Sequence, residues 1–206
     1  MERLLKSGIS IGKLILDDGL VRNISDTLFN DLLKDGLYAK VGVSGEMFNN
    51  VGKKIATRDR ATFYHRAIAL GFDAFDAEDL NFIGTLYFNG EGVEKNDEEA
   101  IRYYKLSADQ GNANAQCYLG FCYGNGEGID RNDEEAFKYF KLSANQGYAR
   151  AQYCLGACYE SGRGVDRNDE EALKYYRMSA AQGDEDAINA VKEYEEKMKD
   201  TTGTSC

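Results

Sequence analysis

Residues 113–148 read ANAQCYLGFCYGNGEGIDRNDEEAFKYFKLSANQGY, and this stretch decides the fold because it is repeated. The segment that follows it, 149–184, is identical to it at 22 of 36 positions, and the segment before it, 77–112, at 19. The three copies follow one another without gaps. Tandem copies of this length are typical of solenoids, in which each unit buries its apolar face only against its neighbours.

Each copy predicts two helices. The first half, for example AQCYLGFCY over 115–123, carries apolar residues at helical spacing and ends at the glycine cluster 124–128. The second half begins at Asn132, which forms a capping-box pattern with Glu135 in an acidic first turn. It ends at Gly147, because glycine suits the left-handed conformation that follows a helix.

Small residues recur at one position of each expected helix, where the two helices can cross closely. Pairs of tyrosine and phenylalanine fill the space around each crossing. The small residues are Gly84, Gly120 and Gly156 in the first helices and Ala100, Ala136 and Ala172 in the second.

This pattern resembles the Sel-like repeats, which are close relatives of the tetratricopeptide repeat. The matching residues are Ala115 to Gly120, Tyr123, Gly126 to Ile129, Asp133, Ala136, Tyr139-Phe140 and Ala144 to Gly147. One departure is tyrosine or phenylalanine where the family often places tryptophan. The resemblance covers 77–184, about half of the chain. It implies an all-α fold, an α-solenoid in which antiparallel helix pairs form a right-handed superhelix of 36-residue repeats.

We divide the chain into five parts. Residues 1–58 do not follow the repeat and are expected to be mostly helical, although 9–16 fits a strand as well as a helix. This segment either caps the first repeat or makes a separate interaction. Residues 59–76 resemble a degraded half-repeat and a linker, and 77–184 hold the three repeats. A charged capping helix follows at 185–199, and 200–206 form a flexible tail.

Composition and charge limit the classes of partner. With 43% hydrophobic and 12% aromatic residues, the chain is expected to fold despite a net charge of −10. Residues 77–206 hold 14 basic and 25 acidic side chains, which disfavours nucleic acid and anionic membranes. No apolar run is long enough to span a bilayer. We therefore expect a protein or peptide partner, no nucleic acid and no membrane span, and leave the oligomeric state open.

The five cysteines are an odd number, which favours free thiols in a reducing cytoplasm. A secreted effector is the alternative, because the N-terminus has the basic start of a signal peptide. Cys122 and Cys158 stand at the position of Leu86, and Cys154 at that of Tyr118. These thiols therefore occupy apolar positions and are expected to pack as small hydrophobic groups, not to bind a metal.

Other motifs predict no chemistry. The stretch GNGEG over 124–128 lacks the lysine and threonine of a phosphate-binding loop, and 130–135 has Glu135 where a calcium loop requires glycine. The single histidine, His65, has no catalytic partner at a recognisable spacing. We expect no catalytic residues, no cofactor and no metal, and hence no enzyme.

The resemblance implies a non-enzymatic protein–protein interaction scaffold or adaptor that binds a peptide or protein segment on the concave face. The alternatives are a regulatory subunit of an enzyme complex, or a weak hydrolase as suggested for cysteine-rich relatives. The resemblance also implies twelve groove positions, some of which could pack against neighbours instead. They are Glu78, Asn81, Thr85 and Phe88 in the first copy, Asn114, Cys117, Phe121 and Asn125 in the second, and Arg150, Tyr153, Ala157 and Glu160 in the third.

Overall fold

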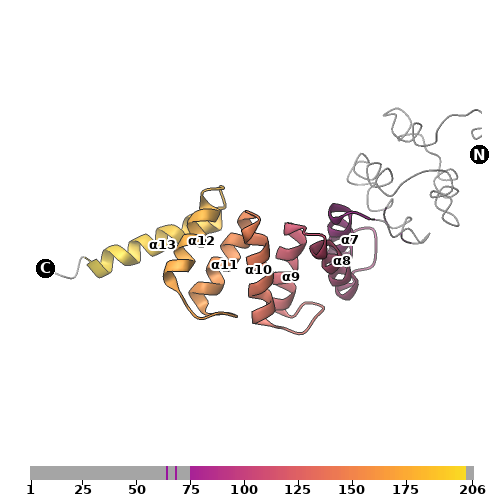
Figure 1. Cartoon of the computed structure of the whole chain (residues 1–206), viewed down its shortest axis with the longest axis horizontal. Helices are drawn as coiled ribbons and strands as arrows, with labels where there is room; N and C mark the ends of the chain where they lie inside the picture. Colours follow the sequence, from indigo (N-terminus) through magenta and orange to yellow (C-terminus); the bar gives the residue numbers. More distant parts are fainter. Residues whose placement is uncertain (1–63, 65–67, 69–74, 203–206) are drawn as a thin grey trace, which may run out of the picture. The chain divides into compact units, whose positions relative to one another are not determined.

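The computed structural model describes residues 64, 68 and 75–202, with side chains up to residue 197 (Figure 1). The chain forms two compact units, 1–100 and 101–206, that meet inside one helix. Each unit is described by itself below. The expectations for 1–58 and for most of 59–76 lie outside the described residues.

The described residues form helices and no strands, so the expected all-α repeat fold is confirmed. In the second unit, helices α9 to α12 lie side by side in chain order, and α13 packs against α12 and extends away from the array (Figure 1). The helices are α7 (Ala77–Asn89), α8 (Asp97–Asp109), α9 (Ala113–Asn125), α10 (Asp133–Asn145), α11 (Ala149–Ser161), α12 (Asp169–Ala180) and α13 (Glu185–Thr202).

The second helix of each repeat begins at an asparagine cap, as expected. The Asn132 side chain accepts a hydrogen bond from the Glu135 backbone N–H at 3.0 Å, and Asn168 does the same for Glu171. The expected capping box is only half formed, because the Glu135 carboxylate forms an ion pair with Lys138 Nζ at 3.0 Å instead of turning back to the cap. The acidic first turn still faces the positive end of the helix dipole.

Glycine ends the helices where the backbone must turn left-handed. Gly147 follows α10 with φ 88°, as expected from the sequence. In the loop after α11, Gly164 has φ 70°, and a Cβ there would collide with the Asp133 carbonyl of the preceding repeat. Only glycine fits this contact, which brings the loop of one repeat against the first turn of α10.

The two helices of a repeat cross where a glycine faces a buried ring. A Cβ at Gly120 of α9 would lie 2.5 Å from Cε1 of Phe140 in α10, and one at Gly156 would lie 2.7 Å from Cδ1 of Tyr176. Both rings are buried. The expected close crossing at these glycines is therefore present, with an aromatic ring in the space that a side chain would need.

Buried polar side chains fix the register of the helices. The Ser143 hydroxyl donates to the Ala113 carbonyl at 2.7 Å, and Ser179 repeats this bond to Ala149. The Gln146 amide donates to Gln116 Oε1 at 2.8 Å, and the Gln116 amide reaches the Ala108 carbonyl of the preceding repeat at 3.4 Å. These bonds satisfy polar groups that would otherwise be costly to bury.

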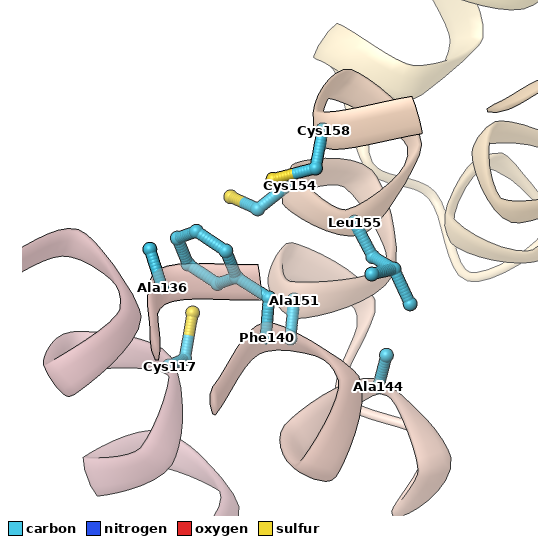
Figure 2. Close-up of a cluster of buried hydrophobic side chains, with 8 residues drawn as sticks. All are labelled: Cys117, Ala136, Phe140, Ala144, Ala151, Cys154, Leu155 and Cys158. Atoms are coloured by element: carbon cyan, nitrogen blue, oxygen red, sulfur yellow. The ribbon is translucent and has the colours of Figure 1, made fainter. Parts of the chain in front are cut away.

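Thiols and small side chains form the core between the second and third repeats (Figure 2). Cys154 and Cys158 point from α11 toward the Phe140 ring, and Cys117 joins the cluster from α9. All three are buried, as are Cys122 and Leu155. The four described cysteines are free thiols. Burial and the neighbouring Cys154 raise the pKa of Cys158 to about 12, while Cys117 and burial raise the pKa of Cys154.

The ends of the repeat array differ in part from expectation. In the first unit, the helical residue Tyr64 is buried against the rings of Phe75 and Phe82. Tyr64 is the second residue of the aromatic pair Phe63-Tyr64 in the expected half-repeat. At the other end, α13 continues to Thr202, three residues beyond the expected capping helix. Residues 200–202 are thus helical and not part of a tail, and 203–206 lie outside the described residues.

The crossing contact yields a prediction for two glycines of one helix. Gly120→Ala should destabilise the protein by about 1–3 kcal/mol, because the buried Phe140 ring must move. Gly124→Ala is the matched control, since its nearest neighbours outside the helix lie at 3.6 Å. There the gain in helix propensity should leave stability unchanged or raised by up to about 1 kcal/mol. The measurement is the melting temperature of the two variants, and equal melting temperatures would contradict the close crossing at Gly120.

The buried thiols yield a prediction for high pH. Because folding raises their pKa, they favour the folded state below the unfolded pKa, and this stability is lost as pH rises toward the folded value. The melting temperature should therefore fall above about pH 9. A Cys154→Val, Cys158→Val double variant should show a shallower fall, since the buried tyrosines still titrate. An identical slope in the variant would contradict this account.

Candidate functional site

The expected groove positions lie at regular intervals along the first helix of each repeat. In the first unit they occupy α7, where the Thr85 hydroxyl donates to the Asn81 carbonyl at 3.0 Å. The Asn81 side-chain oxygen has no hydrogen-bond partner among the described residues. In the second unit the positions lie on α9 and α11, where the site can be described in full.

A pocket of about 420 Å³ opens between α9 and α11, with the buried Ala136 and Phe140 of α10 in its lining. It brings together five of the eight positions expected on α9 and α11, namely Phe121, Asn125, Tyr153, Ala157 and Glu160. The other lining residues are Gly120, Gly124, Asp133, Cys154, Cys158, Ser161 and Arg163.

Three expected groove residues lie outside this pocket. Cys117 is only 3% exposed and belongs to the core, so its assignment to an open groove is wrong. The cause is its position on α9, which faces Phe140 and the thiols of α11. Asn114 is exposed in the first turn of α9. Arg150 lies over the Tyr153 ring at 5.3 Å and pairs with Asp186 at 2.6 Å.

The aromatic walls of the pocket also pack against the core. The Phe121 ring meets the buried Phe140 ring edge to face, with 5.2 Å between centroids. Tyr153 lies 5.5 Å from the buried Tyr176 ring. Each ring therefore packs on a buried neighbour and also lines the pocket, where it remains partly exposed.

Two arginines and one carboxylate form a group of ion pairs at one side of the pocket. Arg163 donates to the Gly124 carbonyl at 2.8 Å and to Asp133 at 3.0 Å. Arg131 also binds Asp133, at 2.9 Å. The two guanidinium groups, Arg131 first, hold the pKa of Asp133 below its usual range. This side therefore holds two guanidinium groups that share one carboxylate.

Glu160 on the other side is held by tyrosine hydroxyls. The Tyr176 hydroxyl donates to Glu160 Oε2 at 2.7 Å. Burial, followed by this carboxylate, raises the pKa of Tyr176, and the same causes raise the pKa of Tyr194 to about 12. Both hydroxyls therefore stay protonated at neutral pH. Among the described residues, Glu160 thus accepts from a neutral donor and forms no direct ion pair, although Arg167 interacts with it electrostatically.

Sequence reasoning missed several lining residues. Gly124 is the counterpart of Phe88 and Glu160, so a strict 36-residue register would have found it in place of Asn125. No sequence pattern marks Arg163 as a lining residue, because it lies in a loop and its partners, Asp133 and Gly124, are 30 and 39 residues earlier in the chain. Cys154 and Cys158 were expected in the core, and they lie in the core and form part of the pocket lining.

The arrangement suits binding more than catalysis. The pocket lining includes the thiols of Cys154 and Cys158, whose raised pKa keeps them protonated, and the Ser161 hydroxyl, which donates to the Ala157 carbonyl of its own helix at 2.6 Å. Within the part of the chain that the structure describes, no group of three or more histidine, cysteine or acidic residues could hold a metal ion. Among the same described residues, no helix combines the length and apolar character needed to cross a membrane.

Solved structures with similar folds carry the same type of repeat. The chain is 36% identical to a Sel1 repeat protein from Oxalobacter formigenes, with a TM-score of 0.54 over 57% of this chain and 89% of that one. It is 27% identical to c5321, a protective antigen of uropathogenic Escherichia coli with an SLR fold, with a TM-score of 0.63. That match covers 79% of this chain but 35% of c5321. Among curated proteins, none matches the chain.

The family comparison agrees with the repeat pattern. The Sel1 repeat model matches residues 77–112, 113–148 and 149–184, which together make up just over half of the chain. Proteins with this repeat generally act in protein–protein interaction, and the fold is generally a non-catalytic scaffold. The sequence matches and the repeated helix pairs thus show that the chain belongs to the Sel1 repeat family.

Proposed function

We propose that this protein is a non-enzymatic cytoplasmic adaptor that binds a segment of a partner protein in the groove between α9 and α11. The observation that carries the proposal is the pocket itself, where partly exposed aromatic rings surround an apolar floor. Binding hot spots have this composition, with aromatic anchors surrounded by polar groups that exclude water. Pockets of about 300–1,000 Å³ are typical ligand sites.

The polar groups at the rim support a peptide-like ligand. Asn125 is exposed at the end of α9, where its amide nitrogen lies 3.3 Å from a Glu127 carboxylate oxygen. Asparagine amides can bind both the N–H and the C=O of an extended backbone. A regulatory subunit of an enzyme complex would use the same groove, so this alternative differs only in the partner.

The test compares two surfaces of the second unit. Phe121→Ala with Tyr153→Ala removes both aromatic walls of the groove, whereas Leu142→Ala with Met178→Ala removes exposed side chains of α10 and α12, which are 43% and 41% exposed. A partner captured by the unchanged protein should bind the groove variant at least about 30-fold more weakly, because a hot-spot truncation costs about 2 kcal/mol or more. The control variant should bind normally.

Two measurements make the outcome clear. Because Phe121 packs on Phe140, the groove variant is expected to melt a few degrees lower, and its helical circular dichroism should be retained. Affinity is then measured well below the melting temperature of both variants. Normal affinity in the folded groove variant, or an equal loss in the control, would place the binding surface elsewhere.

A further inference from the structure

Position 124 differs in kind from its counterparts in the other repeats. The first copy has Phe88 there and the third has Glu160, whereas the second has glycine. A Cβ at Gly124 would meet the Ala136 Cβ and an Arg163 nitrogen at 3.6 Å, which is ordinary contact. Glycine is therefore not required for packing at this position, as it is at Gly120. Its effect is to remove from this pocket the side chain that the other copies carry at the same position.

The pocket has an apolar lining suited to an aromatic ring. The Phe121 and Phe140 rings contribute to it, in an edge-to-face pair. The thiols of Cys154 and Cys158 also contribute. Aromatic rings prefer edge-to-face neighbours, and sulfur contacts at a ring edge are favourable. A phenylalanine-type side chain therefore fits this lining better than a polar one.

The charged residues of the pocket indicate which residues of a ligand would stand next to a bound aromatic side chain. Two carboxylates, Asp133 and Glu160, and one guanidinium group, that of Arg163, line the pocket. Asp133 binds Arg131 and Arg163, whereas Glu160 accepts from the Tyr176 hydroxyl and forms no direct ion pair among the described residues, Arg167 acting on it only from a longer distance. The whole chain has a net charge of −10. A lysine or arginine beside the ring would be attracted to Glu160, and an acidic neighbour would be repelled.

We propose that the absence of a side chain at Gly124 makes this pocket an anchor site for one aromatic side chain of a partner segment, flanked by a basic residue that faces Glu160. This inference rests on the proposed function and specifies the class of segment that the groove accepts. Gly124 is then a specificity-determining residue, because it selects the repeat in which the ring is bound.

The test uses three capped tripeptides with the full chain: Lys-Phe-Lys, Lys-Ser-Lys and Glu-Phe-Glu. Binding is followed by ¹⁵N NMR titration, which also locates the site. Lys-Phe-Lys should shift the amides of Phe121, Gly124 and Cys158, with a Kd in the millimolar range, or about −4 kcal/mol. The serine and glutamate peptides should each bind at least about fivefold more weakly, since the first lacks the ring and the second is repelled.

Two variants at one position complete the design. Gly124→Phe introduces the residue that the first copy has at this position, and its ring should fill the pocket and lower the affinity for Lys-Phe-Lys at least about tenfold, or 1.4 kcal/mol. Gly124→Ala is the matched control and should bind within about threefold of the unchanged protein, since a methyl group occupies little of the pocket. The peptide comparison on the unchanged protein stays informative even if Gly124→Phe folds poorly.

Each outcome separates this inference from the adaptor function. No binding of Lys-Phe-Lys, equal binding of Lys-Ser-Lys, or full binding by a folded Gly124→Phe would overturn the anchor site. If the captured partner is lost by the Phe121, Tyr153 variant but retained by Gly124→Phe, the groove function stands and the anchor site fails. If the partner is retained by both, the groove function fails as well.

Discussion

The close crossing of two helices, with a glycine of one beneath an aromatic ring of the other, is the contact on which the repeats depend. Gly120 admits the Phe140 ring and Gly156 admits the Tyr176 ring. The same two rings also build the site. Phe140 forms part of the pocket lining and supports Phe121, while Tyr176 supports Tyr153 and holds Glu160. A change that separates the helices would therefore deform the groove, so stability and binding are coupled through these rings.

Polar bonds set the register within which that crossing works. The ring can lie over its glycine only if the helices do not slide, and the bond from the buried Ser143 to the Ala113 carbonyl joins α10 to the start of α9, between residues 30 positions apart in sequence. Gln116 extends this order between repeats, since it accepts from Gln146 and donates to the end of the preceding helix. A half-satisfied buried network would be costly, so each bond depends on the others. This explains why serine and glutamine recur in the copies although both are buried and polar.

The repeat period made most of the helix pairs predictable, because caps such as Asn132 and glycines such as Gly147 act through local backbone geometry. The site was less predictable, since it depends on contacts between repeats. The burial of Cys117 follows from its position opposite Phe140, which the spacing along one helix does not reveal. Arg163 reaches Gly124 and Asp133 across a repeat boundary, so no local pattern marks it. The sequence likewise does not show whether the Glu135 carboxylate binds the backbone N–H of Asn132, as in a capping box, or Lys138, as it does in the structure.

Differences between copies carry more information about binding than the residues that the copies share. A residue identical in all three copies, such as the Gln-Gly turn, has a structural role that each repeat needs. Positions 88, 124 and 160 hold phenylalanine, glycine and glutamate on equivalent turns, so the shared fold does not require any one of them. In the second unit, Gly124 and Glu160 line the same pocket, and Glu160 adds a carboxylate to it. A repeat array can thus keep one packing scheme and still present a different chemical surface at each step, because these variable positions lie one helical turn after the crossing glycine and accept different side chains.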